Sequence, residues 1–157
     1  MSQLITLFDK YKWWTGTSYG GHEGYDVPDV YNKYLALQFN LVMGLNADVN
    51  FIIWCNEHHI NPIIRPYGFL EPRNQKSPDW WGLGQFVKWC TDHGYEAYIQ
   101  LGNEEPASDE YVTFWQQGAE VVIANGGHPG VGAVFNQDVG HFLFKLHNNG
   151  KLHYLTD

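Results

Sequence analysis

Cationic side chains are scarce in this chain of 157 residues, which carries 9 Lys and Arg against 17 Asp and Glu and a net charge of −8. Nucleic acids and anionic membranes are bound by clustered cations, so neither is a predicted partner. No apolar run reaches the roughly 18 residues that a membrane-spanning helix needs. The first residues lack a basic segment followed by an apolar one, so no signal peptide is predicted and the compartment stays open. The composition predicts a soluble protein.

Cysteine is also rare, and Cys55 and Cys90 are the two examples. Each follows a Trp within a helical pattern, which predicts two buried free thiols rather than a disulfide. The sequence contains neither HExxH nor a CxxC pair, and the adjacent side chains of 57–59 (Glu-His-His) point in different directions on a helix. No metal site is predicted. Because no GxGxxG or GxxxxGK[ST] follows a predicted strand, no cofactor is expected either.

Aromatic residues, in contrast, are abundant at 17% of the chain, with 7 Trp, 10 Tyr and 9 Phe. Large rings fill hydrophobic cores efficiently. Flat rings beside a cleft can also stack on the faces of sugars. Both interpretations stay open for each ring at this point.

A repeat of 35 residues organises the middle of the chain. The stretch FIIWCNEHHINPIIRPYG (51–68) aligns with FVKWCTDHGYEAYIQLGN (86–103), and AEVVIANGGHPGVGAVFN (119–136) is a fainter third copy. Each copy reads as an amphipathic helix, a polar turn and a short apolar strand. His58 and His93 occupy matching positions near helix ends, where they are expected to interact favourably with the C-terminal carbonyl groups.

Periodicity and turn signals place the individual elements. Helices are predicted over 83–90 and 111–122, the second with Ser108 as its N-cap. The segment 138–150 is predicted to form one more helix. Short apolar runs predict strands at 34–44, 62–67, 96–102 and 131–135. A last strand is expected to begin within 151–157, near the end of the chain.

Helices and strands that alternate at this spacing predict βαβ units and a parallel sheet. A doubly wound sheet and a (β/α)₈ barrel both fit, but the absence of a nucleotide-binding motif disfavours the first. A full barrel needs about 250 residues. The sequence therefore predicts one α/β domain over 1–157, a partial TIM-type (β/α) barrel of about four to five βα units. Residues 1–33, rich in glycine and aromatic residues, are predicted to form an N-terminal loop region that covers a cleft.

Functional groups in parallel α/β folds gather at the C-terminal ends of the strands. Arg65 and Tyr67 are expected at one strand end, 103–105 (Asn-Glu-Glu) at the next and 136–138 (Asn-Gln-Asp) at a third. Such a polar set suits a neutral ligand rich in hydroxyl groups. A plainer interpretation also stays open, because acidic residues are expected wherever a helix begins.

The stretch YIQLGNEEP (98–106) carries a family resemblance. A strand, an Asn-Glu pair, a Pro and then a helix with aromatic residues resemble the glycoside hydrolases built on (β/α)₈ barrels, in which the Asn-Glu pair ends the fourth strand. NPIIRPYGF (61–69) resembles the third strand of such barrels, and GGHPGVGAVF (126–135) the turn into the fifth. The resemblance covers roughly residues 34–150.

The resemblance implies that Glu104 is the general acid/base and that Asn103 binds the sugar 2-hydroxyl. A carboxyl surrounded by apolar side chains has a raised pKa and can hold a proton near neutral pH. Glu105 competes for the role but lacks an immediately preceding Asn. The remaining residues that are predicted to line the carbohydrate cleft are Arg65, Tyr67, Trp80, Trp81, Trp115 and His128.

Retaining hydrolysis also needs a second carboxylate about 5–5.5 Å away, which this family carries at the seventh strand. Here the last Glu is Glu120, in a predicted helix, and the predicted strands number five or six. Three explanations are open. The chain is a fragment, a second copy or another chain completes the barrel, or the protein has lost hydrolysis and serves as a glycan-binding or self-assembling structural subunit.

Overall fold

Five strands form one parallel sheet in the computed structural model of the chain, which describes residues 16–18, 35–36, 41–44, 49–70, 78–103, 105–132 and 139–155, without the side chains of 16–18 and 67. The strands lie side by side in chain order, and every pairing is parallel. They are β1 (Gly16–Ser18), β2 (Leu41–Gly44), β3 (Asn61–Ile64), β4 (Tyr98–Leu101) and β5 (His128–Val131).

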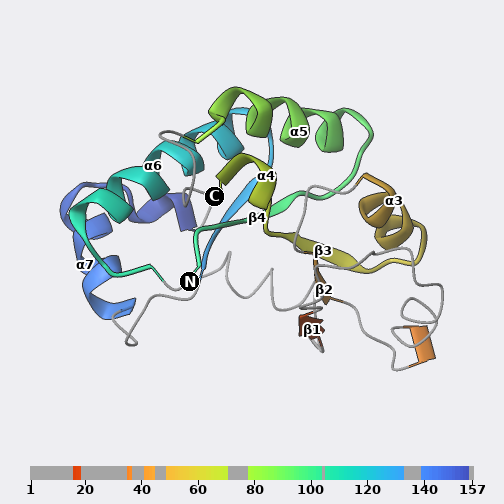
Figure 1. Ribbon diagram of the computed structural model, residues 1–157, viewed down its shortest axis with the longest axis horizontal. Coiled ribbons are helices and arrows are strands. Elements are labelled where there is room, and N and C mark those ends of the chain that lie inside the picture. Colours follow the sequence, from red (N-terminus) through yellow and green to blue (C-terminus); the bar gives the residue numbers. More distant parts are fainter. Residues whose placement is uncertain are drawn as a thin grey trace.

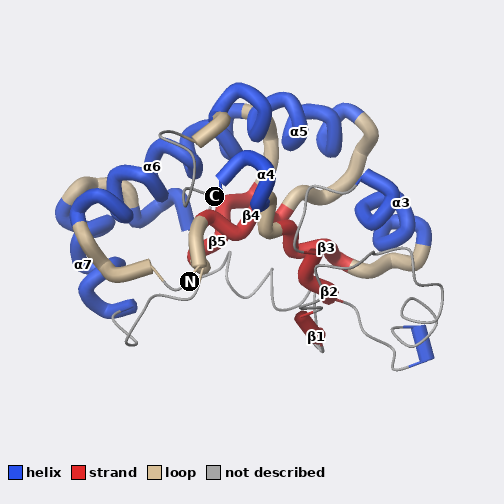
Figure 2. The backbone as a smooth tube through the Cα atoms, in the orientation of Figure 1, coloured by secondary structure: helices blue, strands red, loops and turns tan. Residues whose placement is uncertain are grey.

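The helices lie together along one side of this sheet (Figures 1 and 2). This follows from topology, because right-handed crossovers that always advance to the next strand leave every helix on the same face. Doubly wound sheets instead reverse their strand order, so the predicted α/β fold of successive βα units is confirmed and the doubly wound alternative is wrong. The helices are α3 (Val49–Glu57), α4 (Tyr67–Leu70), α5 (Trp80–Asp92), α6 (Asp109–Ala124) and α7 (Val139–Asn148).

The register of β3 on β4 matches the repeat seen in the sequence. Ile63 pairs with Tyr98 and Ile64 pairs with Ile99, each 35 residues apart. Two aligned repeats therefore become two neighbouring units of the sheet, displaced by one strand. The third copy does not keep the alignment, because Tyr98 pairs with His128, 30 residues further on.

The strand predicted at 131–135 is wrong by three residues at its start, since β5 begins at His128. Its Pro129 had the appearance of a turn signal. The N–H group of His128 donates to the Ala97 carbonyl at 2.8 Å, so this group faces β4. Backbone direction alternates along a strand, and the nitrogen of Pro129 therefore faces away from β4, where no donor is needed.

The N-terminal strand predictions also need correction. Of the strand predicted over 34–44, residues 41–44 form β2 and residues 35–36 are helical, whereas 34 and 37–40 lie outside the described residues. It is the second strand of the sheet rather than the first, because β1 lies within the region predicted as a loop over 1–33 and pairs with β2. The rest of that region lies outside the described residues.

The predicted interaction of His58 and His93 with carbonyl groups at the ends of their helices is confirmed. His58 Nδ1 lies 2.8 Å from the Trp54 carbonyl oxygen, and His93 Nδ1 lies 2.8 Å from that of Trp89. Each imidazole also packs on the indole four residues earlier, with ring centroids 4.8 Å and 4.5 Å apart. Each imidazole therefore adds a second hydrogen bond to a carbonyl group of the last helical turn, which also accepts the backbone N–H of the same histidine.

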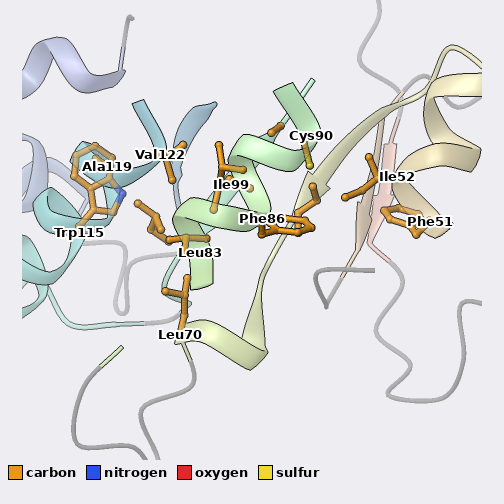
Figure 3. Close-up of a cluster of buried hydrophobic side chains, with 14 of the residues drawn as sticks. Phe51, Ile52, Leu70, Leu83, Phe86, Cys90, Ile99, Trp115, Ala119 and Val122 are labelled. Atoms are coloured by element: carbon orange, nitrogen blue, oxygen red, sulfur yellow. The ribbon is translucent and has the colours of Figure 1, made fainter. Parts of the chain in front are cut away.

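A hydrophobic core fills the space between the sheet and the helices (Figure 3). Ile64, Ile99 and Leu101 enter it from the strands and are fully buried. Cys55 and Cys90 lie in the same core as free thiols, as predicted, and burial raises the pKa of each thiol, that of Cys90 to about 12. None of the described helices combines the length and apolar character needed to cross a membrane.

The C-terminal segment forms a short 3₁₀ helix, η2 (Leu152–Leu155), so the strand predicted at 151–157 is wrong. Side chains hold this segment against α6. Lys151 Nζ donates to Glu120 Oε1 at 3.0 Å and to the Tyr154 hydroxyl at 2.7 Å, and that hydroxyl donates to Glu120 Oε1 at 2.9 Å. Glu120, Lys151 and Tyr154 thus form a closed triangle of hydrogen bonds, and this triangle favours a tight turn over an extended strand.

We expect Glu120→Gln to lower the melting temperature by about 1–2 °C at pH 7, as for other exposed ion pairs. The hydrogen bonds from Lys151 and Tyr154 lower the pKa of Glu120. A carboxyl whose pKa is lower in the folded state stabilises above its unfolded pKa, and the contribution is lost as the pH falls through the folded value. The difference between the two proteins should therefore shrink as the pH falls below about 4.3, the ordinary pKa of a Glu carboxyl. Thermal unfolding from pH 3 to 8 measures it.

Glu57→Gln is the matched control for this change, because Glu57 is an exposed carboxylate that belongs neither to the triangle nor to the first turn of a helix. It should not reproduce the loss of melting temperature at pH 7. An equal loss in both variants would show that net charge, not the triangle, carries the effect.

Candidate functional site

Polar residues follow the C-terminal ends of β3 and β4, which meet at one edge of the sheet because the strands are parallel. Arg65 directly follows β3, is half-buried and donates its backbone N–H to the Gly44 carbonyl at 2.8 Å. Tyr67 begins α4, and its side chain is outside the described parts. Asn103 follows β4 and is half-buried, while Glu104 lies outside the described residues. The structure thus places Arg65 and Asn103 at the same edge, as predicted.

The chain leaves β4 through Gly102, whose conformation is fixed from several sides. Its φ of +80° lies in the left-handed region that favours glycine, and an added Cβ would stand 2.6 Å from a ring carbon of Tyr111. The Gly102 carbonyl accepts a hydrogen bond from Gln100 Nε2 at 3.1 Å. Gln100 is buried, so this bond satisfies a polar group that water cannot reach. The direction in which Asn103 leaves the strand is set by these contacts.

Tyr111 connects α6 to the C-terminal end of β4 through a hydrogen bond. Its hydroxyl donates to the Leu101 carbonyl at 2.8 Å, and the residue is buried. Burial raises the pKa of this phenol and the negative charge of Glu105 raises it further, while a hydrogen bond from the Gly132 backbone acts in the opposite sense. The phenol therefore stays protonated and remains a donor at physiological pH.

We expect Gly132→Ala to lower the free energy of unfolding by about 3 kcal/mol. A Cβ at this position would overlap the carbonyl oxygen of Gly102, a backbone atom that no rotamer change can move. Gly140→Ala is the control, because nothing lies within 4 Å of its added Cβ and alanine favours the α7 helix. Urea unfolding compares the two. A loss below about 0.5 kcal/mol in Gly132→Ala would contradict the close approach of the two strand ends.

The start of α6 has the predicted cap. Ser108 Oγ accepts a hydrogen bond from the Tyr111 backbone N–H at 3.1 Å, and Asp109 and Glu110 occupy the first turn. Carboxylates are favourable at this positive end of a helix. The helix that follows the Asn-Glu pair therefore has its first turn stabilised by a side-chain cap and by two carboxylates.

Trp115 does not line a cleft, and its prediction as a ligand-binding residue needs correction. The side chain is fully buried within the core (Figure 3). Its Nε1 donates to the Gly130 carbonyl at 3.2 Å, and its ring meets that of Phe142 edge-on with centroids 5.6 Å apart. A ligand cannot reach this indole in the folded chain.

His128 is also separated from the other predicted site residues. As the first residue of β5 it lies at the N-terminal end of the strands, opposite to Arg65 and Asn103. There its Nε2 approaches Glu96 Oε2 at 3.2 Å, and its ring stacks on Tyr98 at 4.9 Å. No pattern in the sequence predicts this cluster, because the register that pairs β4 with β5 does not follow the 35-residue repeat.

Trp80 and Trp81 belong to the first turn of α5, in the helical layer and not on a strand. Trp80 is half-buried and packs on Phe114 of α6 with ring centroids 5.2 Å apart. Trp81 is 76% exposed and is the most exposed of the large hydrophobic side chains in the described ranges. Of the three tryptophans predicted to line the cleft, Trp81 is thus the one whose indole is largely exposed.

Within the described ranges, no cluster of three or more His, Cys, Asp or Glu side chains is arranged to hold a metal ion. Comparison of the chain with protein-family models, with curated proteins and with solved structures gives no match.

Proposed function

We propose that the chain is a carbohydrate-active, glycoside hydrolase-like protein in which Glu104 acts as the general acid/base on a glycosidic bond. One observation carries the proposal. Among the described strands, β4 is the fourth of a parallel sheet in chain order, and Asn103 and Glu104 follow its end. The resembled family carries its Asn-Glu pair at the end of the fourth strand.

Two neighbouring segments support the same alignment. The stretch that resembles the third strand of the family contains β3, and the stretch that resembles the entry into the fifth strand contains β5. The roles then follow from chemistry. Glu104 would protonate the leaving oxygen, Asn103 would hold the sugar 2-hydroxyl, and Arg65 would bind further hydroxyl groups at the same edge.

A second candidate is a glycan-binding or self-assembling subunit without hydrolytic activity. The observation that favours it is that hydrolysis needs two carboxylates, whereas the described strand ends supply only Glu105, next to Glu104 itself. In the described part of the chain, β1 and β5 each have one neighbouring strand. Exposed strand edges pair readily with other chains, so we propose a second copy or a partner chain that completes the barrel.

Assays of the native chain against a panel of polysaccharides and aryl glycosides test the proposal, with a glycan pull-down and a measurement of solution mass beside them. Turnover supports the acid/base role. Retention on a glycan without turnover favours the binding subunit. Neither turnover nor retention would reject both carbohydrate proposals, and an assembled mass in that case would favour a structural subunit.

A further inference from the structure

The sequence contains two Asn-Gly pairs, and both lie just beyond the C-terminal end of a helix. Asn125 and Gly126 follow α6, and Asn149 and Gly150 follow α7. The two turns have the same backbone geometry. Gly126 and Gly150 have φ values of +83° and +68°, and their N–H groups donate to the carbonyl three residues earlier at 2.9 Å and 3.0 Å. The turns therefore form a matched pair whose surroundings differ.

An Asn-Gly pair can lose ammonia without an enzyme. Hydroxide removes the amide proton of the glycine, and the nitrogen attacks Cγ of the asparagine side chain. The new C–N bond closes a succinimide ring, and the side-chain amide leaves as ammonia after taking a proton from water. Water then opens the ring to give an aspartyl or an isoaspartyl residue. Glycine favours this reaction because it has no Cβ to hinder the attack and because its backbone is conformationally permissive.

The fold restrains Asn125 from several sides. Asn125 Nδ2 donates to the Val121 carbonyl at 2.8 Å, and the Asn125 carbonyl accepts a hydrogen bond from Thr91 Oγ1 at 2.9 Å. Gly127 is buried, and a Cβ built on it would stand 2.7 Å from a methyl carbon of Val87. The chain then enters β5 directly. Rotation of the asparagine amide toward the following nitrogen would therefore require movement within the core.

Asn149 lacks these restraints. The residue is exposed, and its side chain has no hydrogen-bond partner among the described residues. Gly150 is exposed as well, and nothing lies within 4 Å of a Cβ built on it. The turn is followed by η2, none of whose residues is buried. Opening this turn exposes little apolar surface, and the exposed ion pair of Lys151 with Glu120 adds little resistance.

We propose that Asn149 is a site of spontaneous deamidation, and that the fold selects this Asn-Gly pair over the pair at 125–126. The new carboxylate lies at the C-terminal end of α7, where the helix dipole makes an anion unfavourable. An isoaspartyl residue also adds a methylene group to the backbone, so the N–H of Lys151 loses its 2.9 Å hydrogen bond to the Leu146 carbonyl. The modification therefore loosens the attachment of η2 to α6. It does not depend on the proposed function.

Incubation of the full chain at pH 8 and 37 °C, followed by digestion and mass spectrometry, tests this inference. Chromatography separates the aspartyl and isoaspartyl peptides. We expect Asn149 to be converted at least about tenfold faster than Asn125, a ratio that corresponds to about 1.4 kcal/mol in the free energy of local opening. In concentrated urea, where the turns are absent, the two sites should react at similar rates.

The same samples test the consequence for η2. Conversion should lower the melting temperature of the aged native chain by about 1–3 °C. Asn149→Gln is the matched control, because its longer side chain closes the ring far less readily, and it should keep its melting temperature through the incubation.

Equal or faster conversion of Asn125 in the folded chain would overturn the inference. So would the absence of conversion at Asn149 over a period in which the chain in urea is converted there. A preference for Asn149 that persists in urea would assign the selectivity to local sequence and not to the fold. An equal fall of the melting temperature in Asn149→Gln would reject the loosening of η2.

Discussion

Replacing Trp115 by alanine should lower the free energy of unfolding by about 3–5 kcal/mol. The indole is fully buried, fills the space between α6, α7 and the sheet, and contacts Phe142. Its removal would leave a cavity and would also leave the Gly130 carbonyl without the donor at Nε1. Urea unfolding followed by circular dichroism measures the loss, because the signal does not depend on the deleted fluorophore.

Trp81→Ala is the matched control, since it removes the same side chain from a position that is 76% exposed. Its effect should stay within about 0.5 kcal/mol, as for other surface substitutions. A similar loss in both variants would contradict the assignment of Trp115 to the core. Unchanged stability in Trp115→Ala would reopen the possibility that this ring binds a ligand.

If the chain hydrolyses a glycoside, Glu104→Gln should reduce kcat by about 10²- to 10⁴-fold, the range that general acid/base catalysis contributes. The amide keeps the shape of the carboxyl but cannot transfer the proton. We expect little change in KM, because the loss falls on the transition state. The loss should be smallest for aryl glycosides with acidic leaving groups, which need little help from an acid.

Glu105→Gln provides the control for that experiment, because it changes the adjacent carboxyl in the same way. It should retain most of the activity, since Glu105 does not follow an Asn directly. If the loss appeared in Glu105→Gln instead, the acid/base assignment would move by one residue. Equal activity in all three proteins would reject an acid/base role for either carboxyl.

The sequence revealed most of the architecture because the repeat encodes it. A spacing of 35 residues between Ile64 and Ile99 is also the register of β3 on β4. The same reasoning failed at β5, where Pro129 resembles a turn residue and is tolerated because its nitrogen faces away from β4. It failed again at 151–157, where the exposed triangle of Glu120, Lys151 and Tyr154 forms through contacts distant in the sequence.

The candidate site was predictable in part. The rule that polar groups gather at the ends of parallel strands correctly placed Arg65 and Asn103 at one edge. Composition could not separate the buried Trp115 from the exposed Trp81, since both follow aromatic neighbours in amphipathic helices. Whether each indole is buried depends on which face of its helix packs against the sheet, and tertiary packing determines that face.

The match between repeat length and sheet register has a consequence for cooperativity. Each βα unit contacts chiefly the units before and after it, so the described sheet resembles a short linear array of coupled segments. Opening of such an array starts at its ends and moves inward. Amide protons of β3 and the start of β4 should therefore exchange most slowly, and those of β1 fastest. A unit added beyond an end strand would extend the protected region without altering the register already present.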